Sequence, residues 1–370
     1  MPTRPLPARP DLEQLRHQAK DLMKLHASGD PAALQRIREF HPRFYVEADA
    51  AIRTAVFKLS DAQLTIAREY GFTSWPRLKA RIEKPTPADD ASRRHDERID
   101  DAGFRHAVQL LDSGDEAALR LYLTERPGIV HRVMFQGGNY FRNPSLLEFI
   151  AENPIRHGKL PKNIVEITRV ILDAGARADQ ESMDSTLALV CSGRVPRECG
   201  VQVPLIDLLC HYGAKPDQAM LPALAHGEFG AAEALLARGA TRDLAMASAM
   251  GRLDEAQRLL PVATRESRHR ALALAAQHGH AEIVRLLLEA GEDPSRYNPV
   301  GCHSHSTPLH QAAWGRHQQA VKVLVEHGAR LDVRDILFSG TPADWAQHAG
   351  YAEIETYLRE RDQASGREHT

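Results

Sequence analysis

The sequence has few of the features that mark secreted, membrane or zinc-stabilised proteins. Its four cysteines show no Cys-x-x-Cys spacing, which argues against a structural zinc site and against a disulfide framework. No run approaches the roughly 18 apolar residues of a transmembrane helix. The N-terminal stretch MPTRPLPARPDLEQL lacks the apolar segment of a secretion signal. We therefore expect a cytoplasmic protein that does not interact with a membrane.

Concentrated charge and catalytic motifs are also missing. The formal net charge is -2, and no dense run of lysine and arginine offers a stripe that neutralises phosphates. The chain contains no glycine-rich phosphate loop, no G-x-S-x-G nucleophile motif and no H-E-x-x-H zinc motif. Nucleic acid is therefore not an expected partner, and no cofactor is expected.

Repetition is the strongest positive signal in the chain. Thr307-Pro308 and Thr341-Pro342 stand 34 positions apart, and each pair opens a short alanine-rich segment. Glycine adopts the left-handed conformation that ends many helices, so a recurring glycine predicts recurring helix ends. The pattern Gly-Ala-x-x-Asp recurs at residues 175–179, 213–217, 239–243 and 328–332.

Residues 307–312, TPLHQA, fill the T-P-L-H-x-A signature of the ankyrin repeat, a β-turn followed by two antiparallel helices. The region resembles ankyrin-repeat proteins, although the second copy has Asp344 where the histidine would stand. The resemblance implies an all-α ankyrin-repeat solenoid, which we read as about seven irregular repeats with inserted loops. It also implies a concave groove that recognises a protein partner, and a structural role for His310 in bonding adjacent turns.

Composition divides the chain into five predicted segments. The segment at residues 61–83 resembles helical stretches found ahead of ankyrin arrays in bacterial proteins, which implies a bacterial source. We read the helical region that contains it as a cap on the open end of the solenoid. The five segments are a proline-rich flexible lead-in (1–10), an N-terminal helical capping bundle (11–83), a linker (84–101), the solenoid (102–360) and a disordered tail (361–370).

Four insertions depart from the plain repeat. Insertions between repeats become loops, often on the binding face, so we expect these four to bracket one groove. The first carries Gln-Gly-Gly-Asn between short aromatic and β-branched runs, which predicts a hairpin. The four insertions are residues 131–144, 191–204, 296–306 and 335–340.

His303 and His305 are the leading candidates for chemistry. A His-x-His pair could place two imidazoles on one side of an extended segment, as in many metal sites. Three interpretations stay open: a polar turn that hydrogen-bonds neighbouring loops, a contact with a protein partner, or an acid/base or divalent-metal centre. The last would need a further ligand such as Glu148, Asp344 or His310.

The other candidates are polar or aromatic side chains of the insertions and nearby helices. Arg197 and Glu198 could clamp a carboxylate or form a local ion pair. Cys302 could act as a nucleophile if an imidazole held its thiolate, or be an unreactive thiol. Trp314 could line the groove or pack between repeats. The candidate ligand-binding residues are Asn139, Tyr140, Arg142, Cys302, Trp314 and Asp335.

The sequence thus predicts an intracellular binding protein that holds a protein partner or a small ligand in its concave groove. The alternative is a small-molecule hydrolase or lyase with a histidine-containing active site, and a structural subunit of a larger complex is a third reading. Convergence of His303, His305 and an acidic residue in a closed pocket would favour the enzyme.

Overall fold

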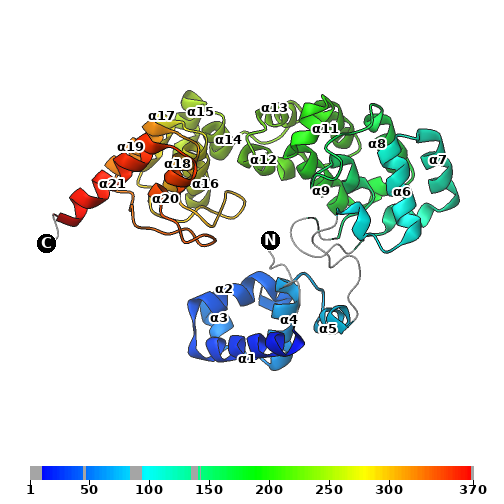
Figure 1. Ribbon diagram of the computed structural model, residues 1–370, viewed down its shortest axis with the longest axis horizontal. Coiled ribbons are helices and arrows are strands. Elements are labelled where there is room, and N and C mark those ends of the chain that lie inside the picture. The colour runs from blue at the N-terminus through cyan, green and yellow to red at the C-terminus, as the bar shows by residue number, and fades with distance from the viewer. Residues whose placement is uncertain (1–10, 45–46, 84–93, 135–140, 142, 368–370) are drawn as a thin grey trace. The chain divides into compact units, whose positions relative to one another are not determined.

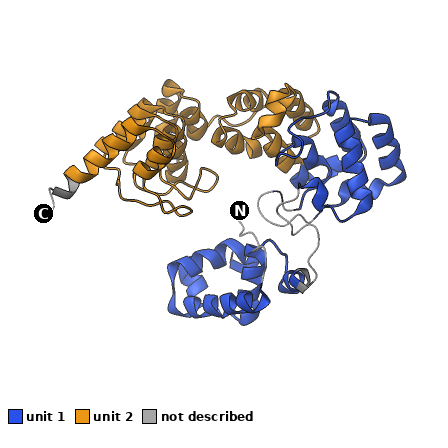
Figure 2. Cartoon of the chain, in the orientation of Figure 1, with its two compact units in different colours: residues 1–182 blue, residues 183–370 orange. Residues whose placement is uncertain are grey.

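The computed structural model describes residues 11–44, 47–83, 94–134, 141 and 143–367. Within these ranges the chain forms helices and no β-strand, and one isolated antiparallel bridge joins Val133 and Ser145. The chain divides into unit 1, residues 1–182, and unit 2, residues 183–370 (Figure 2). The predicted all-α class is confirmed. Among the described helices, none combines the length and the hydrophobicity that crossing a membrane requires.

Unit 1 begins with a small helical bundle that has its own core. Asp11 and Asp30 cap the first two helices by accepting backbone hydrogen bonds, as their positions predict. Asp61 lies in the first turn of the fourth helix and accepts from the backbone N–H of Lys58. The bundle consists of α1 (Leu12–Ser28), α2 (Pro31–Phe40), α3 (Asp49–Thr54), α4 (Leu59–Glu69) and α5 (Trp75–Glu83) (Figure 1).

The remainder of unit 1 contains the predicted helix pair near residues 104–123. The backbone N–H of Met134 donates to the carbonyl of Pro144 over 2.9 Å, next to the Val133–Ser145 bridge. The tip of the predicted hairpin, residues 135–140, lies outside the described residues, so the hairpin stays a prediction. The elements are α6 (Ala102–Ser113), α7 (Glu116–Glu125), η4 (Pro127–His131), η5 (Leu147–Ala151), α8 (Ile164–Asp173) and η6 (Ala176–Ala178).

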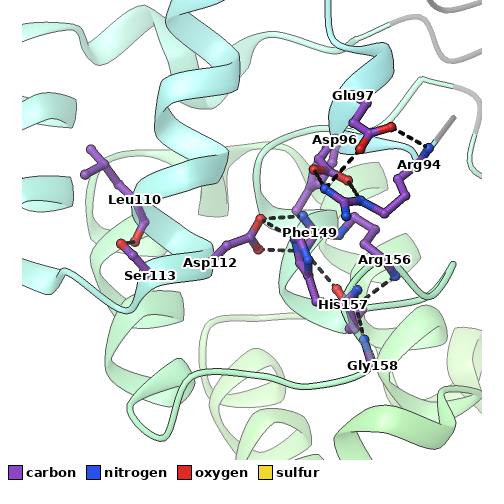
Figure 3. A network of polar contacts seen from close by, with 11 residues as sticks. Arg94, Asp96, Glu97, Leu110, Asp112, Ser113, Phe149, Arg156, His157 and Gly158 are labelled. Carbon is purple, nitrogen blue, oxygen red and sulfur yellow. Dashed lines mark hydrogen bonds and ion pairs between the residues drawn. The ribbon is translucent and has the colours of Figure 1, made fainter.

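A buried ion network fixes the segment between η5 and α8 (Figure 3). The Arg156 guanidinium donates to both carboxylate oxygens of Asp112, each at 2.9 Å, and to the Phe149 carbonyl. It also lies 3.0 Å from the carboxylate of Glu152, and the Arg156 and Glu152 side chains are both buried. Glu152 in turn accepts backbone hydrogen bonds from Arg156, His157 and Gly158.

Unit 2 consists of stacked helix pairs. Before the regular pairs stand α9 (Gln180–Cys191), α10 (Arg194–Glu198) and α11 (Gln202–His211). The interval between Gly239 and Gly291 contains two pairs. The successive pairs are α12 (Pro216–Ala225) with α13 (Phe229–Ala237), α14 (Leu244–Ala249) with α15 (Leu253–Leu259), α16 (Arg265–Gln277) with α17 (Ala281–Glu289), α18 (Pro308–Trp314) with α19 (Gln318–Glu326), and α20 (Pro342–His348) with α21 (Ala352–Arg367).

Two histidines hydrogen-bond to the preceding helix pair, and a glycine of that pair leaves room for each imidazole ring. The Nε2 of His280 donates to the Ala249 carbonyl over 2.9 Å, and a Cβ on Gly251 would lie only 2.6 Å from that ring. His317 repeats the arrangement on Gln277 and Gly279. The imidazole therefore needs glycine beneath it, and these two of the 19 histidines have an architectural role.

The C-terminal helix extends further than the sequence suggested. We expected a disordered tail from residue 361, yet α21 continues through Arg367. Charged residues of this segment have good helix propensity, and Glu355 pairs with Arg359 one turn on, over 2.9 Å. Of the predicted linker, residues 84–93 lie outside the described residues, and the other domain boundaries stay predictions.

Candidate functional site

Asp335 organises the loop that joins α19 to α20. Its carboxylate accepts backbone hydrogen bonds from Leu337 (2.9 Å), Phe338 (2.7 Å) and Gly340 (2.9 Å), and one from the indole of Trp345 (3.0 Å). Burial favours the neutral acid, but these donors outweigh burial, and the pKa of Asp335 lies below its ordinary value. The side chain is buried and holds the loop, and it does not line the pocket described below.

Three consecutive apolar side chains project from this loop into solvent. Ile336 is 65% exposed, Leu337 64% and Phe338 76%. We name residues 336–338 the apolar tip. Its backbone is anchored twice more, because Ile336 donates to the His305 carbonyl over 2.8 Å and Arg334 donates to the Ser339 carbonyl over 2.6 Å. The tip is therefore an exposed apolar surface on an ordered backbone.

The insertion at residues 296–306 folds back onto α12, which lies three helix pairs earlier. Gly301 has a φ of 87°, a conformation that favours glycine, and a Cβ there would come within 2.7 Å of the end of the Leu221 side chain. The His303 ring donates to the backbone carbonyl of Ala225. Tyr297 hydroxyl donates to the Arg334 carbonyl, which joins this loop to the one that carries the apolar tip.

The six-residue helix α14 allows α16 to reach α12 directly. Gln277 Nε2 donates to the Ala225 carbonyl over 2.7 Å, and His278 Nε2 donates to the Leu224 carbonyl over 2.8 Å. These bonds connect residues more than 50 positions apart and bring the ends of α12 and α16 to one place.

Together these elements enclose a pocket of about 1010 Å³. Its walls are rich in histidine and aromatic rings, and no lysine or arginine lines it within the described residues. The polar and aromatic lining residues are His226, Gln277, His278, His303, His305, Gln311, Trp314, Phe338, Asp344, Trp345 and His348.

A continuous row of rings forms one wall of the pocket. The ring centroids of His303 and His305 lie 6.1 Å apart, and the ring centroids of His305 and Trp345 lie 5.8 Å apart. The indoles of Trp345 and Trp314 meet edge-on at 5.9 Å, and Trp314 stacks on His348 at 6.1 Å with planes 17° apart. Trp314 is 49% exposed and His348, the last ring of the row, is exposed as well, so the row ends at solvent.

The pocket is uncharged apart from one carboxylate. Burial lowers the pKa of His226, His303 and His305, and repulsion from a neighbouring imidazole adds to the effect for the last two. The Asp344 carboxylate accepts from the backbone N–H of Thr341 and from the Arg359 guanidinium, and its own backbone N–H donates to the Thr341 hydroxyl. The hydrogen bonds from Thr341 and Arg359 lower the pKa of Asp344 and keep it ionised at neutral pH. The imidazoles of His226, His303 and His305 are therefore neutral at the pH at which Asp344 is negative.

Replacing His278 by glutamine should reduce the acid sensitivity of folding. Burial lowers the pKa of His278 to about 4, whereas an unfolded histidine titrates near about 6.5. Between these values the unfolded chain binds more protons, so the free energy of unfolding falls as the pH decreases through that window. From pH 7 to pH 5 this one group costs about 2 kcal/mol.

Glutamine keeps a donor for the Leu224 carbonyl and does not titrate. Urea unfolding at pH 7 and at pH 5 measures how much the free energy of unfolding decreases between the two pH values. This decrease should be smaller by about 2 kcal/mol in His278→Gln than in the wild type. Equal losses in the two proteins would refute the assignment.

The structure brings only some of the candidate site residues together. His303, His305, Trp314 and Asp344 line the pocket. Cys302 is buried, and burial raises its pKa to about 12, so it is a thiol and not the proposed thiolate nucleophile. Candidates Asn139, Tyr140 and Arg142 lie outside the described residues.

The remaining candidates take part in local contacts elsewhere. Glu148, in unit 1, accepts from the backbone N–H of Ser145 over 2.7 Å. Arg197 and Glu198 lie 4.0 Å apart, but each has a closer partner, Glu228 at 3.4 Å for Arg197 and Arg194 at 3.2 Å for Glu198. None of the three lines the pocket. Within the described residues, no three His, Cys, Asp or Glu side chains form a group that could hold a metal ion.

Sequence reasoning missed several lining residues, although a signal existed. His226 and His278, which were not candidates, directly precede the glycine after the first helix of their pair, and the candidate Trp314 occupies the same position in its own pair. Equivalent positions of stacked repeats lie on one face, so aligning the repeats on that glycine would have grouped these three residues.

Comparison with known proteins agrees with this architecture. The family model described as "Ankyrin repeats (3 copies)" matches residues 244–335, from α14 through α19. Cyclin-dependent kinase inhibitor 2A of Homo sapiens is 34% identical over 121 residues, 31% of this chain and 74% of that protein. Cyclin-dependent kinase 4 inhibitor B of Bos taurus is 33% identical over 117 residues, 24% of this chain and 88% of that protein. The chain belongs to the ankyrin-repeat family.

Proposed function

We propose that this chain binds a protein partner, and that the apolar tip is the centre of the contact. The observation that carries the proposal is the exposure of Ile336, Leu337 and Phe338 on a backbone that Asp335 holds in place. Neighbouring apolar side chains that are ordered and exposed mark interaction surfaces, because covering them releases water at little cost in conformational entropy.

Two further observations support a protein as the partner. The related proteins are named as inhibitors of cyclin-dependent kinases, which are themselves proteins. The enzyme alternative has less support, because His303 bonds a backbone carbonyl and the described residues offer no metal-ligand cluster. A cytoplasmic location and a bacterial source belong to the proposal, although the relatives named above are mammalian.

Site-specific photo-crosslinking tests the proposal. A benzophenone amino acid replaces Leu337 in one full-length protein and Val262, which is 81% exposed in η7 (Leu260–Val262), in a matched control. Illumination in the source cells should give a discrete adduct with one protein at position 337 and not at position 262. Identical adducts at both positions, or none at position 337, would contradict the proposal.

A further inference from the structure

The pocket beside the apolar tip has a chemistry that selects one kind of side chain. We propose that it receives an arginine side chain of the partner, together with the peptide backbone on either side. This inference rests on the proposed function, since it names what the partner presents.

Charge is the first argument. The lining within the described residues includes Asp344 and no lysine or arginine. Asp344 is also 3.3 Å from Arg359, but that arginine has a second and closer partner in Glu355, at 2.9 Å. A cationic group entering the pocket would meet a carboxylate and neutral rings, whereas an acidic group would be repelled by Asp344.

The aromatic wall is the second argument. Trp314, Trp345 and Phe338 all line the pocket, and Trp314 and Phe338 keep much of their surface exposed. A planar guanidinium is weakly hydrated and stacks on such rings, and tryptophan gives the strongest cation–π contact. The hydrogen bond from Trp345 to Asp335 fixes the orientation of the inner indole.

Hydrogen-bond capacity is the third argument. The imidazoles of His226, His305 and His348 line the pocket and make no hydrogen bond within the described residues. A neutral imidazole has one acceptor nitrogen, and guanidinium presents five N–H donors in one plane. Guanidinium therefore suits this lining better than ammonium, which has three donors and holds its water more strongly.

Volume and position indicate that the arginine arrives within a peptide. About 1010 Å³ is at the upper end of ligand pockets, which run from roughly 300 to 1,000 Å³, and exceeds what one side chain fills. Phe338 belongs both to the pocket and to the apolar tip, so the two surfaces are continuous. Residues flanking the arginine would lie against the tip.

Short peptides and the full-length protein provide the test, with calorimetry and tryptophan fluorescence as readouts. Acetyl-Gly-Arg-Gly-amide should bind saturably, and the citrulline peptide, which has the same shape without the charge, at least tenfold more weakly. The lysine peptide should fall between them. Trp314→Ala and Phe338→Ala should each weaken binding at least about fivefold, and Leu121→Ala, an exposed position in α7, should not.

Several results would overturn the inference: no saturable binding of the arginine peptide, equal binding of the citrulline peptide, tighter binding of acetyl-Gly-Glu-Gly-amide, or equal binding of free arginine. Equal binding of free arginine would indicate a small-molecule site instead of a peptide site. If none of the peptides binds while position 337 still crosslinks, the arginine pocket is refuted and the proposed function stands. If the arginine peptide binds and position 337 does not crosslink, the proposed function falls alone.

Discussion

Arg156→Ala should lower the free energy of unfolding by about 3 to 5 kcal/mol, the usual cost of leaving a buried charge without its partner. Glu152 is fully buried and lies 3.0 Å from the guanidinium. Without Arg156 it keeps three backbone donors but no countercharge. Asp112 loses both of its bonds to the same group.

Hydrogen exchange of residues 147–164 together with urea unfolding measures this effect. Arg120→Ala is the matched control, because Arg120 makes an exposed ion pair with Glu116 one turn away and should cost less than about 0.5 kcal/mol. The double variant Glu152→Gln, Arg156→Met should recover part of the loss, since the fully buried carboxylate of Glu152 is then replaced by a neutral amide, and only Asp112 still lacks the guanidinium. If Arg156→Ala behaved like Arg120→Ala, the network would not stabilise the fold.

Asp335→Ala should cost about 2 to 4 kcal/mol and release the apolar tip. The substitution leaves three backbone donors and one indole donor without their acceptor, and hydrogen bonds to a charged group contribute about 1.5 to 3 kcal/mol each. The full sum is not expected, because a loop near the C-terminus can open and let water reach the freed donors.

The readout is again urea unfolding, with hydrogen exchange at residues 336–340 to report on the loop. Asp332→Ala serves as control, because the Asp332–Arg330 pair is exposed and should contribute less than about 1 kcal/mol. Protection of the loop in Asp335→Ala equal to that of the wild type would show that other contacts hold the tip.

The architecture was predictable because ankyrin repeats carry local signals. A glycine after a helix reports its own backbone conformation: Gly213, Gly239 and Gly328 all have positive φ, at 107°, 92° and 83°. The Thr-Pro openings likewise report the first turn of the helix that follows them. Each signal lies within a few residues of the feature that it specifies, so it can be read without knowing the fold.

The pocket and the ion network were not predictable in this way. Gln277 meets Ala225 across 52 positions, and Arg156 meets Asp112 across 44. No local pattern marks these partners, because α14 and the chain between η5 and α8 must first take their shapes. The sequence located the His303–His305 loop, but only the fold showed that it shares a pocket with Trp345, Trp314 and further histidines, and that the described residues place no three metal-ligating side chains together.

The affinity of the crosslinked partner, once purified, for two matched variants is the most direct test of the central claim. Leu337→Asp places a charge on the apolar tip, and Val262→Asp places one on a more exposed apolar position elsewhere in unit 2. Leu337→Asp should weaken binding at least about 30-fold, as expected at a binding hot spot, with Val262→Asp within about twofold of the wild type. Equal affinities for the two variants would contradict a binding surface centred on residues 336–338.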